Sequence, residues 1–227
     1  MKTKTRFAWK QFLKNLAIIA IPVALQNMLT TTGSMIDTIM IAPLGETTVG
    51  AVGLCAQFSS LMFAGYWGFF GGGMLFFSQY WGAQDDDGID HSYGLTLTCM
   101  MIVGLTFGVF AIFAPETVMK LYTDKESIQV IGAEYLRIIG FGYPVQVFSM
   151  AMSALLRSTE RVRIPLFASI ASVASNIFLN WVFIYGKFGL PEMGVRGAAL
   201  ATVIGQIFGM LIGLWGVFVH QKVLQVN

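Results

Sequence analysis

The residues of this chain that could do chemistry are oxygen-bearing and amide side chains at helical spacing. Asp37 stands in an otherwise apolar stretch, and Gln26, Thr30 and Ser34 precede it at intervals of three or four residues. At ~100° per residue, these side chains fall on or beside one stripe of a helix. An ionised carboxylate is costly in such a stretch unless it is paired, hydrated or protonated. We therefore expect that Asp37 either belongs to an ion-coupling site or snorkels to the lipid headgroups.

Two later apolar stretches carry similar stripes. Asn176 and Asn180 are four residues apart, as are Thr202 and Gln206. Their amides could line a water-filled path, or they could hold neighbouring helices together by hydrogen bonds. Carboxylate, amide and hydroxyl oxygens suit a proton or an alkali cation, whereas transition metals prefer His and Cys ligands, which these polar stripes do not contain. The pattern predicts H⁺ or Na⁺ coupling at Asp37, Asn176, Asn180 and Thr202, and a substrate cavity lined by Gln26, Thr30, Ser34 and Gln206.

The elements that must position these side chains are membrane helices. The chain is 56% hydrophobic and 11% charged, with a mean hydropathy of +0.69, against roughly 25% charge in a soluble domain. Six stretches contain no charged residue or His, and each exceeds the ~18 residues that a bilayer crossing needs. They are Asn15–Ile36, Thr47–Gln84, Ser92–Pro115, Ile138–Leu156, Ile164–Gly186 and Gly197–Val219. We conclude that the protein is not a soluble enzyme, and its net charge of +2 gives no basic surface for nucleic acid.

The predicted fold is an all-α integral membrane protein with a bundle of six transmembrane helices. Proline and glycine breakers separate the helices. The expected helices span about 15–43, 47–82, 90–114, 127–157, 163–187 and 194–220. They form a lobe over residues 15–221, flanked by a basic cytoplasmic segment at 1–14 and a cytoplasmic tail at 221–227. Glycines at 205, 209, 213 and 216 share one side of the last helix, where they should let a neighbouring helix approach closely.

The distribution of Lys and Arg predicts the orientation. With the amino terminus inside, the inner side holds Lys2, Lys4, Arg6, Lys10, Lys14, Arg157, Arg161, Arg163 and Lys222. The outer side holds only Lys120, Lys125, Lys187 and Arg196, with Arg137 unassigned at a span edge. Because basic residues concentrate on the cytoplasmic side, both termini are expected in the cytoplasm. The expected location is a cell membrane, the inner or plasma membrane of a bacterium.

An ordered set of short motifs resembles the amino-terminal half of a multidrug and toxic compound extrusion (MATE) transporter. The resemblance extends from Phe12 to Val219. Its motifs are Ser34-Met-Ile-Asp37, Gly50-Ala-Val-Gly-Leu54, Ser78-Gln-Tyr-Trp-Gly-Ala83, the basic segment Leu155–Pro165, Asn176-Ile-Phe-Leu-Asn180 and Gly197-Ala-Ala-Leu-Ala-Thr202.

The resemblance implies an antiporter that exports organic cations in exchange for H⁺ or Na⁺, without any other cofactor. Asp37, Asn176 and Thr202 match an amino-lobe cation site, which could hold Na⁺. Asn180 departs from the family, since many relatives carry Asp there, and this loss of charge favours proton coupling over sodium. The family has twelve helices, so the resemblance also implies a second lobe, either a carboxy-terminal half or a second copy, beside the lipid and small organic cations as partners.

Two other functions stay open from the sequence. One is a lipid-linked oligosaccharide flippase of the same superfold, which would favour basic residues inside the cavity to bind pyrophosphate. The only base that the spans place near an edge is Arg137, which argues against this reading. The other is a six-helix substrate-binding membrane module that depends on a separate partner.

Overall fold

The computed structural model describes residues 9–220 and, within them, every side chain except those at 15, 219 and 220. The elements of this part of the chain are helical throughout. In chain order they are α1 (Trp9–Ile41), the 3₁₀ turn η1 (Ala42–Leu44), α2 (Glu46–Ala83), α3 (Asp86–Phe113), α4 (Pro115–Tyr122), α5 (Glu126–Ile139), α6 (Gly142–Ser158), α7 (Arg163–Ile184) and α8 (Gly194–His220).

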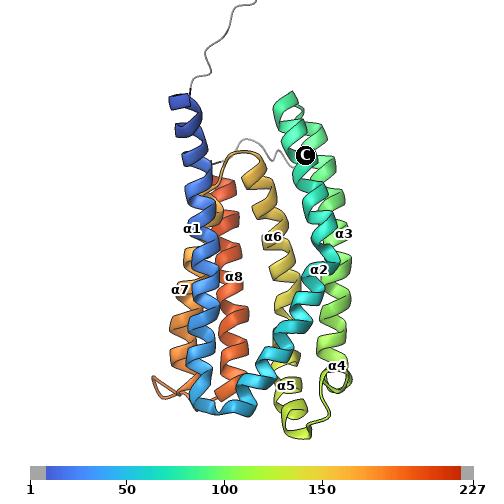
Figure 1. Ribbon diagram of the computed structural model, residues 1–227, viewed down its shortest axis with the longest axis vertical. Helices are drawn as coiled ribbons and strands as arrows, with labels where there is room; N and C mark the ends of the chain where they lie inside the picture. The colour runs from blue at the N-terminus through green and yellow to red at the C-terminus, as the bar shows by residue number, and fades with distance from the viewer. Residues whose placement is uncertain (1–8, 221–227) are drawn as a thin grey trace, which may run out of the picture.

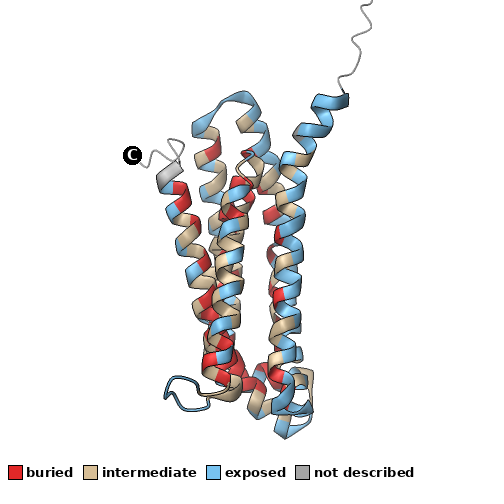
Figure 2. Ribbon diagram, turned by 90° about the vertical axis from the view of Figure 1, so that its left-hand side faces the viewer, coloured by how far each residue is buried: buried red, intermediate tan, exposed pale blue. Residues whose placement is uncertain are grey.

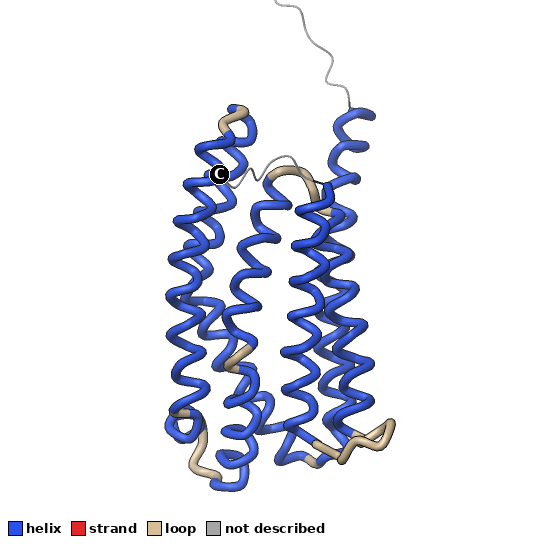
Figure 3. The backbone as a smooth tube through the Cα atoms, turned by 180° about the vertical axis from the view of Figure 1, so that it is seen from behind, coloured by secondary structure: helices blue, strands red, loops and turns tan. Residues whose placement is uncertain are grey.

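The long helices run side by side along the bundle (Figure 1). Five helices are each long and apolar enough to span a membrane, and α5 with α6 makes a sixth span that bends by 52°. The helices α1, α7 and α8 form one side, α2 and α3 form the other, and α6 stands between them (Figure 1). Seen from behind, the connections gather at the two ends of the bundle (Figure 3). The predicted class, an all-α six-helix membrane bundle, is confirmed.

The tightest helix pair is α7 with α8, as the glycine stripe predicted. A Cβ atom added at Gly205 would lie 2.9 Å from the Ser172 carbonyl oxygen, and one at Gly209 would lie 2.7 Å from the Ser172 Cβ. Such distances leave no room for a side chain. The absence of side chains on α8 therefore brings its backbone against α7, which places the polar residues of both helices within hydrogen-bonding reach.

The single helix expected over 127–157 is wrong, because the chain breaks between α5 and α6 at Gly140–Phe141. Pro144 has no N–H to bond the carbonyl of Gly140, and its ring would clash with that carbonyl in a continuous helix. The break also packs closely: a Cβ atom at Gly140 would lie 2.9 Å from the Cβ of Ala111. Proline and glycine together thus bend the span at a point where Gly140 packs against α3.

Other boundaries also differ from the expected ones. The first helix begins at Trp9, so that residues 9–14 of the predicted basic segment are helical. The third begins at Asp86 because the carboxylate of Asp85 caps it, accepting a 2.9 Å hydrogen bond from the Gly88 N–H. The short helix α4, begun by Pro115, was not expected. Residues 1–8 of the predicted segment at 1–14, and the tail predicted at 221–227, lie outside the described residues.

Burial is uneven across the bundle (Figure 2). A core of large side chains is enclosed mainly by α2, α3 and α6, and includes Met62, Tyr66, Met100 and Tyr143. In contrast, α1 packs mainly on α7 and leaves most of its length exposed. Its buried polar residue, Gln26, lies on the side that meets α7. The polar stripe of α1 is therefore held at a helix–helix contact.

Candidate cation site and polar cavity

The centre of the site is Asn180 on α7, which is completely buried. Its Nδ2 group donates to the Oδ1 atom of Asp37 on α1 and to the Oδ1 atom of Asn176, which is 3.3 Å away and one helical turn earlier. The carboxylate of Asp37 thus points into the bundle towards α7. This contact excludes the alternative in which Asp37 snorkels to the headgroups.

The hydrogen bonds continue from α7 to α8. Asn176 donates through Nδ2 to the Thr202 hydroxyl at 3.2 Å, and that hydroxyl donates to the Ala198 carbonyl at 3.0 Å. On the other side, Gly33 lets α1 approach α7, since a Cβ atom there would lie 3.0 Å from Val173. Close packing on both faces of α7 therefore joins the four residues that were predicted to couple ions into one network, which we call the Asp37 network: Asp37, Asn176, Asn180 and Thr202.

The sequence reasoning missed Tyr135, which belongs to the same place. It lies on α5, is almost fully buried, and its side chain lies beside Thr202. The preceding residue, Glu134, forms a bidentate pair with Arg196 of α8, at 2.8 and 3.1 Å. This pair holds α5 against the start of α8. A single tyrosine in a helix of polar and apolar residues does not indicate a site in the sequence, because only the contact between α5 and α8 brings it to the network.

The Asp37 network offers oxygens of the kinds that a proton or an alkali cation prefers. The Oδ1 atom of Asn180 is buried and has no hydrogen-bond partner among the described residues. Leaving such an acceptor without a partner costs about 1–3 kcal/mol, which a bound cation or water would offset. Within residues 9–220, no group of three or more His, Cys, Asp or Glu side chains could hold a metal ion. The donor set therefore suits a single hard cation.

A polar cavity of about 270 Å³ adjoins the network. It is bounded by α1, α6, α7 and α8, and three of the four predicted cavity residues line it: Gln26, Thr30 and Gln206. The fourth, Ser34, does not. Its side chain is exposed and its hydroxyl donates to the Thr31 carbonyl at 2.8 Å. At ~100° per residue Ser34 lies ~80° around the helix from Gln26, which turns it away from α7.

A second missed residue is Arg157 at the end of α6. Its Nη2 group donates to the Oε1 atom of Gln26 at 2.7 Å, and Gln26 in turn donates to the Ser169 hydroxyl at 2.8 Å. The expectation that Arg137 is the base nearest the spans was therefore wrong. Arg137 pairs with Glu116 on the exposed surface instead. The sequence placed Arg157 at the inner end of an expected helix, and its contact with α1 depends on the tertiary packing.

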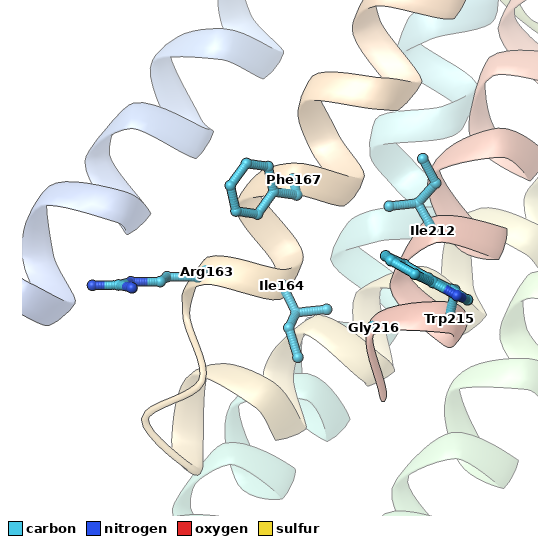
Figure 4. Close-up of a pocket in the computed structure, with 6 residues that line it drawn as sticks. All are labelled: Arg163, Ile164, Phe167, Ile212, Trp215 and Gly216. Carbon is cyan, nitrogen blue, oxygen red and sulfur yellow. The ribbon is translucent and has the colours of Figure 1, made fainter. Parts of the chain in front are cut away.

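A larger pocket, of about 500 Å³, lies on α7 and α8 and takes no part in this site (Figure 4). Apart from Arg163 at its edge, its lining is apolar: Ile164, Phe167, Ile212, Trp215 and Gly216. None of the residues of the Asp37 network lines it. Its size therefore does not make it the candidate site.

The curated proteins that this chain resembles include probable multidrug resistance proteins. The chain is 27% identical over 200 residues to a probable multidrug resistance protein, YoeA, of Bacillus subtilis, a match that covers 88% of this chain and 43% of that protein. It is 26% identical over 214 residues to a probable multidrug resistance protein, NorM, of Neisseria meningitidis, covering 92% of this chain and 46% of that protein. The chain thus spans about half the length of the curated relatives it matches.

Solved structures agree with this result. An outward-facing multidrug resistance MATE transporter superposes with a TM-score of 0.81 at 25% identity, over 92% of this chain and 46% of that one. The family model described as MatE matches residues 22–182, a range that includes Asp37, Asn176 and Asn180. Because that match covers well over half of the sequence, and the fold agrees over nearly all of it, the chain belongs to the MATE family of transporters.

Proposed function

We propose that this chain is one lobe of a multidrug efflux transporter that exchanges organic cations for H⁺ or Na⁺. The observation that carries the proposal is the Asp37 network, in which a carboxylate inside the bundle is held by a fully buried amide. Intramembrane carboxylates of this kind mark ion and proton pathways. The names of the relatives support drug efflux as the transport activity.

In this proposal the coupling ion and the amide of Asn180 compete for the carboxylate of Asp37. Without a bound cation, the carboxylate accepts the hydrogen bond from Asn180. A proton or Na⁺ that binds the carboxylate neutralises it and weakens the hold of Asn180 on α1. Since α1 makes most of its contacts with α7, its position depends on this bond. A second lobe, facing the exposed side of this one, would complete a cavity that opens alternately to the two sides.

The two alternatives have less support. A lipid-linked oligosaccharide flippase is not favoured by the relatives, which carry names of multidrug resistance proteins. Among the described residues, Arg157 is the only base with a hydrogen bond to a residue that lines the cavity, and a pyrophosphate would require more than one cation nearby. A six-helix module with a separate energising partner does not explain why the carboxylate and amides form one network.

The test is ethidium efflux from proteoliposomes in which both lobes are present, under an imposed pH or Na⁺ gradient. We expect the pH gradient to drive efflux, because Asn180 contributes no second charge for sodium. The substitution Asn180→Asp places another carboxylate beside Asp37, and hard cations bind more tightly as the number of charged ligands rises. This variant should therefore gain sodium-driven efflux. If neither the pH gradient nor the Na⁺ gradient drives efflux, the proposed function is refuted.

The orientation is a further part of the proposal, with both termini in the cytoplasm of a bacterial cell. Single cysteines at Glu46 and Glu192, in a chain without Cys55 and Cys99, test it. Both positions lie at the end of the bundle opposite to Trp9, and both should react with an impermeant maleimide added to intact cells. Labelling only after the cells are opened would reverse the proposed topology.

A further inference from the structure

The polar cavity lies between residues next to the Asp37 network and residues near one end of the bundle. Ser172 and Gln206 line the cavity, and each stands one helical turn from a member of the network, Asn176 and Thr202 respectively. Gln26 also lines the cavity, and it contacts Arg157 near the α6–α7 connection. We call the end of the bundle that carries this connection the inner end. Polar side chains therefore run without a fully apolar turn from Asp37 to the inner end.

The cavity has the features of a hydrated space. The Oε1 atom of Gln206 and the Oγ atom of Ser149, both from residues that line it, are buried and have no hydrogen-bond partner among the described residues. Buried polar groups of this kind are ordinarily satisfied by water. The volume of about 270 Å³ is sufficient for several molecules, since each occupies ~30 Å³ in the liquid.

A side-chain bridge between three helices borders this cavity at Gln26. Arg157 of α6 donates to Gln26 of α1, which donates to Ser169 of α7. Gln26 is only 7% exposed, so the bridge is shielded from water at its middle. Hydrogen bonds from a guanidinium are about twice as strong as neutral ones. Because little of α1 otherwise approaches α6, this bridge is the main link between them on the inner side.

We propose that the cavity is a hydrated passage for the coupling proton between Asp37 and the inner end, and that Arg157 gates it by holding Gln26 across the opening. The proposal deepens the proposed function and rests on it. While the bridge is intact, α1 stays linked to α6 and the fixed positive charge repels a cation from the inner side. When α1 moves away, Gln26 leaves Arg157 and the passage opens.

The passage is tested by the rate at which a cysteine inside it reacts with a water-soluble reagent. The reporter is Ser172→Cys in a chain with Cys55→Ala and Cys99→Ala, probed with an impermeant methanethiosulfonate in right-side-out and inverted membrane vesicles. We expect slow labelling while the bridge is intact. With Gln26→Leu or Arg157→Met, labelling from the inner end should rise at least about tenfold, which corresponds to a loss of about 1.4 kcal/mol of closing free energy.

Three controls separate a gate from a loss of structure. Arg157→Lys retains a cationic donor and should keep labelling slow. Arg163→Met removes an exposed arginine from the same end, where it lines the separate apolar pocket, and should leave the rate unchanged. Phe178→Cys, which is 55% exposed on the outside of α7, should stay unreactive in lipid in every background. Gel filtration of each variant checks that it is folded.

Either of two results would overturn the inference. Fast labelling of Ser172→Cys with the bridge intact would show that Arg157 does not close the passage. Slow labelling in folded variants that lack the bridge would show that the cavity is not an inner water path. The labelling needs neither substrate nor a gradient. Failure of dye efflux together with the expected labelling would therefore refute the proposed function and leave the gate standing.

Discussion

Asp37→Asn should abolish ion-driven dye efflux by the two-lobed transporter while leaving insertion and folding intact. Asparagine has nearly the same shape as aspartate, and its Oδ1 atom can still accept the hydrogen bond that Asn180 donates to Asp37. It cannot bind a proton or carry a negative charge, so the coupling ion loses its main ligand. The measurement is ethidium efflux from proteoliposomes under an imposed gradient, with the amount of inserted protein determined for each variant.

Other substitutions serve as controls for the Asp37→Asn experiment. Thr106→Ala, on α3 and outside the network, should leave efflux unchanged, because its hydroxyl only donates to the Ile102 carbonyl of its own helix. Asn176→Ala and Thr202→Ala remove neutral ligands, each worth about 1 kcal/mol, so efflux should fall about fivefold to tenfold. Wild-type efflux by the Asp37→Asn variant would show that the carboxylate only holds α1 in place, and the coupling mechanism would have to be abandoned.

The second large effect concerns the chain alone: a preparation that is demonstrably monomeric should show no efflux at all. The described helices form one lobe, and α1 leaves a broad face of polar and apolar side chains exposed, including Asn27, Thr31 and Met35. Alternating access of this type requires two lobes around a shared cavity. The assay is dye efflux from vesicles, with the oligomeric state fixed by single-molecule photobleaching.

The oligomeric state decides what a positive result means. Efflux that appears only in vesicles with two copies per complex would mean that a second copy supplies the other lobe. Efflux from vesicles with single copies would refute the requirement for two lobes. The control is the Asp37→Asn variant prepared in the same way. It should show no efflux with either one or two copies per complex, which separates transport from leakage of the dye.

Properties that are local along the chain could be predicted from the sequence. The length of an apolar stretch determines whether it can cross a membrane, and the spacing of polar residues determines which face of a helix they share. Both are independent of the neighbouring helices. For this reason residue types and their spacing were sufficient to predict the six spans, the glycine stripe of α8 and the polar faces that carry Asp37 and Asn180.

Properties that depend on contacts between distant segments were decided by the tertiary structure. Tyr135 reaches Thr202 because an ion pair holds α5 on α8, and Arg157 reaches Gln26 across 131 positions of sequence. The close approach of Gly140 to α3 depends on how the helices pack, and the exposure of Ser34 depends on which side of α1 meets α7. Helical periodicity determines which residues share a face of a helix. Only the packing of the helices determines what that face meets, because close contact rather than spacing selects the partners.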